Sequence, residues 1–179
     1  MILHDFDEKF TFSQSLMQND IEIIKQAFPK CINVIKTNED IDKTGIDYIA
    51  ELQGGAKINI DVKRREKGAL RFWKHNEPEL ALETWSVYKK KPGWSVSDIS
   101  NVHFILFVFD KSDCDKYYLL PYQQLRSAFI KNYRDWIKRF DKKQQYSGDW
   151  TSEAVFIPVS VVIEAINQEM QSSLNIKAK

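Results

Sequence analysis

The sequence predicts an α/β (α+β) fold in which a mixed central β-sheet is flanked by helices. Apolar residues recur at helical spacing in three segments, and several short segments alternate between apolar and polar residues. Residues 102–109 form a nearly unbroken apolar run, which is typical of a central strand covered on both faces. Because no repeat, low-complexity tract or Pro/Gly-rich linker interrupts the chain, we expect residues 1–179 to form a single domain.

The first predicted helix follows residues 11–14, whose sequence has the T-x-x-Q form of a capping box. Apolar side chains then recur at helical spacing from Met17 to Phe28, and Pro29 ends the helix. Residues 31–35 come next and alternate as a short strand.

Further elements follow from residue 79 onward. Residues 79–87 are ambiguous, and the alternation around Leu80 and Leu82 favours a strand over a helix. Pro121 can open a helix at its first position, and the apolar residues after it fall within a sector of roughly 120°, while basic residues, among them Lys142, cluster on another side. The remaining predicted elements are strands over residues 117–120 and 154–157 and a helix over residues 159–170.

The charge of the chain is balanced in total but uneven along its length. Lys and Arg total 26 against 25 Asp and Glu, which argues against a polycation of the histone kind. Residues 1–62 carry 6 basic and 11 acidic side chains, whereas residues 63–143 carry 18 basic and 10 acidic ones. An acidic segment next to a basic one suits a metal site beside a polyanion, and an unevenly charged solvated surface is the alternative.

Other classes of protein are excluded by simpler observations. The N-terminal residues lack the basic flank and apolar core of a signal peptide, and the longest apolar run, residues 104–109, is too short to cross a bilayer. Cys31 and Cys114 form no CxxC motif and are expected to be reduced thiols. The three histidines share no metal-ligand spacing. We therefore expect a cytoplasmic protein with no membrane segment and no zinc.

Residues 48–52 and 58–62 alternate around two glycines, which predicts a β-hairpin. With residues 53–55 as the loop, Asp47 opposes Asp61 on one face, where Glu51 also opposes Lys57. A register shifted by one residue would mix apolar and polar faces, which a half-buried hairpin resists. The apolar pairs on the other face are Tyr48 with Ile60, Ala50 with Ile58, and Leu52 with Ala56.

This register predicts a metal site. Opposed β-carbons lie about 5 Å apart, so Asp47 and Asp61 would repel each other unless a cation lay between them. Carboxylate oxygens suit Mg²⁺ or Mn²⁺, and Lys63 projects from the same face, where it can orient or deprotonate a water or neutralise charge on a phosphate. The alternative is that Asp47 caps a turn and that Asp61 and Lys63 form an exposed pair.

Residues 45–47 and 60–63, on either side of a Gly-Gly hairpin, resemble the motif of the PD-(D/E)XK nuclease superfamily, which has a restriction-endonuclease-like fold. That motif places an acidic residue on one strand and acidic-x-Lys on the next. The order of elements is similar across most of the chain. Residues 79–86, followed by 92–94, are similar to nuclease-like proteins of phage or mobile-element type.

The resemblance implies that Asp47 and Asp61 bind the divalent metal and that Lys63 assists the attacking water. It also implies a third acidic ligand, for which Glu83 is the first candidate and Glu22, on the first helix, the second. A surface or structural contact is the alternative for each of these two glutamates.

Two features depart from the superfamily's pattern. Ile46 stands where a proline often precedes the first acid. The core helix expected after the lysine is not obvious, so residues 64–101 are expected to hold a loop and an added strand.

Basic residues after the hairpin are candidates for contacts with nucleic acid. Residues 71–75 mix aromatic and basic side chains, which suits phosphate contact with base stacking, and a hydrophobic plug under a loop is the alternative. Trp85 and Trp94 are expected in the core. The predicted nucleic-acid-binding residues are Arg64, Arg65, Lys67, Arg71 and Lys74.

The expected function is that of a divalent-metal-dependent nuclease, with Mg²⁺ or Mn²⁺ as cofactor, that hydrolyses DNA phosphodiester bonds. RNA is not excluded as a substrate, and action as a homodimer or with a partner protein stays open. The rival interpretation is a catalytically inactive binding protein of the same fold, acting on nucleic acid, as an inhibitor or as a subunit of a complex.

Overall fold

The structure is a computed structural model that describes residues 16–38, 44–65, 68, 73–98, 101–110 and 116–177. The capping box at residues 11–14, Lys67, Arg71 and Cys114 therefore lie outside the described residues. The chain divides into two compact units, Met1–Asp61 and Val62–Lys179. The boundary falls inside a strand, β3 (Lys57–Arg64), whose first five residues belong to unit 1.

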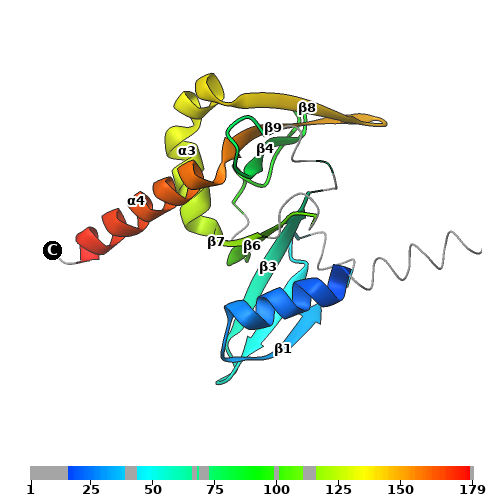
Figure 1. Ribbon diagram of the computed structural model, residues 1–179, viewed down its shortest axis with the longest axis vertical. Coiled ribbons are helices and arrows are strands. Elements are labelled where there is room, and N and C mark those ends of the chain that lie inside the picture. The colour runs from blue at the N-terminus through cyan, green and yellow to red at the C-terminus, as the bar shows by residue number, and fades with distance from the viewer. Residues whose placement is uncertain are drawn as a thin grey trace, which may run out of the picture. The chain divides into compact units, whose positions relative to one another are not determined.

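Unit 1 contains a helix over residues 16–27, β1 (Cys31–Lys36), β2 (Tyr48–Leu52) and the first part of β3 (Figure 1). The strands pair antiparallel in the order β1-β2-β3. Ile24 from the helix and Ala50 and Ile60 from the sheet are fully buried. The structure confirms the predicted helix and strands. The helix and the β2–β3 hairpin bury apolar side chains, whereas β1 leaves Ile32 and Ile35 exposed.

The hairpin between β2 and β3 has the predicted register. Tyr48 pairs with Ile60, and Ala50 pairs with Ile58. The loop is the three residues 53–55, closed by the Leu52 N–H, which donates to the Ala56 carbonyl at 2.8 Å. Its two glycines have φ angles of 93° and 85°, a conformation that residues with a Cβ seldom adopt.

Unit 1 also buries an acid on its helix. Asp20 is 4% exposed, and its Oδ2 accepts a hydrogen bond from the Tyr48 hydroxyl at 3.1 Å. Tyr48 is itself 3% exposed, so its hydroxyl needs a partner in the core. The hydrogen bond therefore ties the helix to the apolar face of the hairpin.

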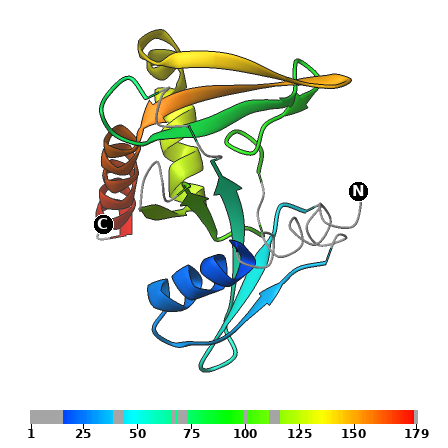
Figure 2. The ribbon, with the colours of Figure 1, turned by 45° about the vertical axis from the view of Figure 1, so that its right-hand side comes forward.

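Unit 2 begins with the last three residues of β3, which are followed in their sheet by β6 and β7. A second sheet has the order β5-β4-β9-β8 (Figure 2). With three helices in the described part of the chain, the fold is mixed α/β with a mixed central sheet, as predicted. The elements are β4 (Glu79–Val87), β5 (Lys91–Pro92), β6 (Phe104–Val108), β7 (Tyr117–Pro121), α3 (Tyr122–Arg139), β8 (Asp141–Ser147), β9 (Trp150–Pro158) and α4 (Val159–Lys177).

The core of unit 2 combines one face of the second sheet with α3 and α4. Leu82 and Val155 are paired across β4 and β9, and both are fully buried. On α3, Leu125 and Phe129 are fully buried and Trp136 is 2% exposed, which confirms the predicted apolar stripe. Residues 105–108 of β6 are buried as well, as expected of a strand covered on both faces.

The start of α4 is capped by a residue distant in sequence. Glu77 accepts hydrogen bonds from the Ser160 backbone N–H at 3.0 Å and from the Ser160 hydroxyl at 2.7 Å. The Val159 N–H donates to the Pro78 carbonyl at 2.9 Å. These bonds satisfy N–H groups that a helix leaves open at its first turn.

Several details of the prediction need correction, among them the last helix, which runs to Lys177 rather than to residue 170. Helix α3 ends at Arg139, so Lys142 lies on β8, a strand that the sequence did not predict. Strand β9 begins at Trp150 rather than Ala154, because β8 pairs with it along its whole length. Pro121 is the last residue of β7 and immediately precedes α3. Among the described residues, no helix is long and apolar enough to cross a membrane.

The Tyr48–Asp20 hydrogen bond can be tested by removing the hydroxyl. Tyr48→Phe removes a donor from a buried carboxylate, which should lower the free energy of unfolding by about 1–3 kcal/mol in urea titrations. The control is Tyr146→Phe, because Tyr146 is 81% exposed, and its effect should stay within about 0.5 kcal/mol. Equal effects of the two substitutions would contradict the assignment.

Candidate metal and nucleic-acid site

Asp47 and Asp61 are neighbours through the backbone of unit 1. Asp61 lies on β3 and is 3% exposed, and Asp47 is half-buried directly before β2. The Asp47 N–H donates to the Ile60 carbonyl at 2.9 Å. This hydrogen bond joins Asp47 to the peptide unit that links Ile60 to Asp61, while the opposition of the two carboxylates stays a prediction.

A carboxylate as buried as that of Asp61 has specific chemical requirements. Removing an ionised carboxylate from water is costly unless hydrogen bonds or a cation compensate. Hard oxygen ligands of this kind suit Mg²⁺ or Mn²⁺, which are held by one or two carboxylates together with waters and phosphate oxygens. The pair Asp47 and Asp61 is consistent with that pattern, although no group of three or more His, Cys, Asp or Glu side chains in the described ranges could hold a metal ion.

Lys63 and Glu83 both belong to unit 2, where Trp94 connects them. Lys63 Nζ lies 5.6 Å from the centre of the Trp94 ring. Burial raises the pKa of the Glu83 carboxyl, and the charge of Lys63, a hydrogen bond from the Trp94 N–H and the charge of Lys91 each oppose this rise. Glu83 lies on β4, as expected, and is close enough to Lys63 for the lysine charge to lower its pKa.

The chain holds Glu83 against Trp94 by a close approach of two backbones. The pairing of β4 with β9 shifts register between Glu83 and Trp85, which marks a β-bulge at this position. A Cβ on Gly93 would lie 2.2 Å from the Glu83 carbonyl oxygen, so only glycine fits. The Ser95 N–H donates to the same oxygen at 3.3 Å.

Helix α3 supports the other side of this loop. The Tyr122 hydroxyl donates to the Trp94 carbonyl at 2.9 Å, and Arg126 Nε donates to the Ser97 carbonyl at 2.8 Å. Trp94 also packs on Phe107, with ring centres 5.9 Å apart. The position of Trp94 beside Glu83 is therefore set by contacts from three separate elements.

The other glutamates considered in the sequence have different surroundings. Glu22 is exposed on the first helix, where it accepts a hydrogen bond from Gln18 Nε2 at 3.2 Å. Glu51 pairs with Lys57 at 3.2 Å, as expected from the register. A hydrogen bond from Asn33, followed by one from Lys57, lowers the pKa of Glu51.

Some of the residues predicted to bind nucleic acid contact other side chains of the protein. Arg64 and Arg65 are half-buried at the end of β3, and the Arg65 guanidinium lies 5.1 Å from the centre of the Phe156 ring. Lys74 is exposed and pairs with Asp141 at 2.7 Å.

Around residues 71–75, Trp73 packs edge-on against the buried Phe109 ring, with ring centres 5.6 Å apart. This contact favours the hydrophobic-plug interpretation at Trp73. Trp85 and Trp94 are half-buried rather than fully buried.

A buried acid on β9 was missed by the sequence reasoning. Glu153 is 2% exposed, and its carboxylate accepts a hydrogen bond from the Thr84 hydroxyl at 3.0 Å and pairs with Lys142 at 3.4 Å. Lys142 reaches Glu153 because it lies on β8, and the polar sequence of that strand carries no alternating signal.

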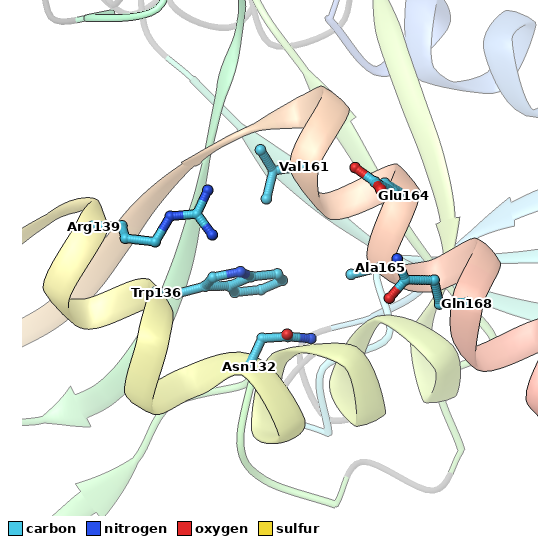
Figure 3. Close-up of a pocket in the computed structure, with 7 residues that line it drawn as sticks. All are labelled: Asn132, Trp136, Arg139, Val161, Glu164, Ala165 and Gln168. Atoms are coloured by element: carbon cyan, nitrogen blue, oxygen red, sulfur yellow. The ribbon is translucent and has the colours of Figure 1, made fainter.

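A groove lies between α3 and α4 in unit 2 (Figure 3). It has a volume of about 190 Å³, and none of the predicted site residues lines it. Arg139, at one end, pairs with Asp135 at 2.8 Å. Its lining consists of Asn132, Trp136, Arg139, Val161, Glu164, Ala165 and Gln168.

Comparison with protein-family models, with curated proteins and with solved structures finds no match to this chain. The assignment of a function therefore depends on the residues and the geometry described above.

Gly93 provides a test of the close approach to Glu83. Gly93→Ala places a methyl group within 2.2 Å of a backbone oxygen and 2.8 Å of Glu83 Cγ, so β4 must shift. Overpacking of this kind should lower the free energy of unfolding by about 1–3 kcal/mol in urea titrations. A variant as stable as the parent would contradict the contact.

The raised pKa of Glu83 makes stability depend on pH. The folded chain holds this proton to higher pH than the unfolded chain, so the resulting stabilisation is complete below the ordinary glutamate pKa and is lost as pH rises through the raised value. Glu83→Gln should therefore become more stable relative to the parent as pH rises above the ordinary glutamate pKa of about 4.3, in urea titrations at a series of pH values. Glu164→Gln, on exposed surface, controls for the lost charge, and a difference for Glu83→Gln that is independent of pH would be evidence against the assignment.

Proposed function

We propose that the protein is a divalent-metal-dependent nuclease that hydrolyses DNA phosphodiester bonds on a restriction-endonuclease-like core. The observation that carries this proposal is the register of the β2–β3 hairpin. It joins Asp47 to the peptide unit before Asp61 and places Lys63 two residues further along the same strand. Residues i and i+2 of a strand project from one face, so Asp61 and Lys63 are presented together.

The donor set fits a small hard cation. Asp47 and Asp61 would hold Mg²⁺ or Mn²⁺, and the burial of Asp61 favours a bound cation, because the cation compensates for the loss of hydration. When bound, such a cation neutralises phosphate charge and makes water more acidic. The two carboxylates themselves act as ligands and fix where a phosphate can approach.

Lys63 would act on the water or on the phosphate. Its ammonium group can donate hydrogen bonds to an attacking water or to an oxygen that gains negative charge. The contact with the Trp94 ring limits the positions that Nζ can reach. Glu83, whose pKa is raised by burial, is a second titratable group near Lys63.

The phosphate backbone would then be contacted by basic side chains that follow the site. In the described residues these are Arg64, Arg65 and Lys74, and Lys67 and Arg71 remain part of the proposal from the sequence. We place the activity in the cytoplasm and assign the chain to the nuclease-like proteins of phage or mobile-element type. The free thiol of Cys31 is consistent with a reducing compartment.

Cleavage assays test the proposed roles. Purified protein should cleave duplex, single-stranded or branched DNA in Mg²⁺ or Mn²⁺ and not in EDTA. Asp61→Asn should abolish cleavage, and Lys63→Ala should reduce it about 10²- to 10⁴-fold. The control is Lys57→Ala on the same strand, because Lys57 is exposed and pairs with Glu51. If the parent cleaves none of these substrates, or if Lys57→Ala is as impaired as Lys63→Ala, the proposal fails.

Calorimetric titration with Mn²⁺ examines the ligands without relying on activity. The parent should bind the ion, and Asp47→Asn should weaken or remove binding because one of two carboxylate ligands is lost. Circular dichroism should show that the variant is folded. A parent that binds no divalent ion would support the rival function of a catalytically inactive binding protein.

A further inference from the structure

The four-stranded sheet of unit 2 ends in two neighbouring turns. One joins β4 to β5 through residues 88–90, and the other joins β8 to β9 through residues 148 and 149. The Tyr88 N–H donates to the Thr151 carbonyl at 2.6 Å, which ties the first turn to the second hairpin. Figure 2 shows β4 and the β8–β9 hairpin reaching the same end of the sheet. We call this end the tip surface: Tyr88, Lys89, Lys90, Lys91, Tyr146 and Trp150.

The tip surface exposes two large aromatic rings. Tyr146 is 81% exposed and Trp150 is 54% exposed, and the other four tryptophans of the chain are half-buried or buried. Tyr146 pairs with Thr151, whereas Trp150 pairs with Ser147 in the next pair along. Successive pairs point to opposite faces, so each face of the hairpin presents one ring. Rings that remain exposed in this way gain from stacking on a flat partner.

The tip surface is also basic. Lys89, Lys90 and Lys91 are exposed, and the only acid in residues 88–91 and 146–151 is Asp149, so these segments carry a net charge of +2. Lys89 has a φ of 57°, a left-handed conformation that glycine or asparagine adopts more readily. Its Nζ lies 5.2 Å from the centre of the Tyr88 ring. A lysine is therefore present where the backbone favours a smaller residue.

Positive charge continues from the tip surface to the candidate site within unit 2. Lys91 pairs with Val87 across β4 and β5, and its charge reaches Glu83, as does the charge of Lys63. A polyanion bound along the three lysines would thus lead toward Glu83 and Lys63. The lysines therefore indicate the path that a bound polyanion would follow along unit 2.

We propose that the tip surface binds single-stranded nucleic acid, with phosphates on the three lysines and unpaired bases stacked on Tyr146 and Trp150. Stacking on side chains is available to unpaired bases and is blocked in a duplex, where both faces of each base are covered. The positive charge favours a polyanion over an apolar protein partner. This inference deepens the proposed nuclease function, since it names a single-stranded substrate region, yet its binding step needs neither metal nor cleavage.

The test is fluorescence anisotropy in EDTA with a labelled single strand of about 20 thymidines and a labelled duplex of equal length. Both ligands are long enough for a binding site that spans several nucleotides. The single strand should bind more tightly. Tyr146→Ala and Trp150→Ala should each weaken binding about 5- to 150-fold. Lys89→Gly, which suits the backbone, should reduce the slope of log affinity against log salt by about 0.7.

Matched controls separate a local effect from a general one. Tyr117→Ala removes a 40% exposed aromatic ring from β7, and Lys138→Ala removes an exposed lysine from α3. Neither should change binding more than about twofold, because both lie outside the tip surface. Asp61→Asn should bind as the parent does, because Asp61 lies outside the tip surface. A parent that binds the single strand but cleaves no DNA in Mg²⁺ or Mn²⁺ would reject the nuclease and keep this inference.

Three results would overturn the inference. The first is a parent that binds no single strand at low salt. The second is equal or tighter binding of the duplex, with Tyr146→Ala and Trp150→Ala unchanged. The third is a change in oligomeric state for these two variants in analytical ultracentrifugation with no change in affinity for the single strand, which would assign the tip surface to a protein contact.

Discussion

The register between β2 and β3 is the constraint on which the candidate site depends. It is determined by burial, because Ala50 and Ile60 have no exposed surface and a shift by one residue would turn them toward solvent. The two glycines of the loop allow the three-residue connection that this register needs. The positions of Asp61 and Lys63 on β3 follow from this register, so the candidate site depends on the packing of the hydrophobic face of the hairpin.

Much of the fold could be predicted because its signals are local. The hairpin, β4 and the apolar stripe of α3 each carry a period that matches their burial, and β6 carries an unbroken apolar run. Strand β8 could not be predicted, since its polar sequence has no alternation and its structure comes from pairing with β9 along its length. The end of α3 was misjudged for the same reason, because the residues that follow Arg139 pair with a later strand.

The candidate site also contains residues that could be predicted from the sequence and residues that could not. Asp47, Asp61 and Lys63 could be brought into one hypothesis from the hairpin pattern, and the pairing of Glu51 with Lys57 followed from it. Trp94 beside Glu83 could not, because a bulge in β4 and hydrogen bonds from α3 position that loop. Asp20 and Glu153 were missed, since a buried acid is recognisable only once its distant partner is known.

The capping of α4 by Glu77 has a consequence for the order of folding. Glu77 lies 83 positions before Ser160, the residue whose N–H donates to it, and α4 has no acidic residue of its own in its first turn. Nucleation is the costliest step in forming a helix, and most helical stability in a protein comes from tertiary packing. The contacts that cap the first turn of α4 thus join residues far apart in the sequence, and such contacts form slowly. Helix α4 is therefore expected to be completed only after the segment that leads into β4 has taken its place.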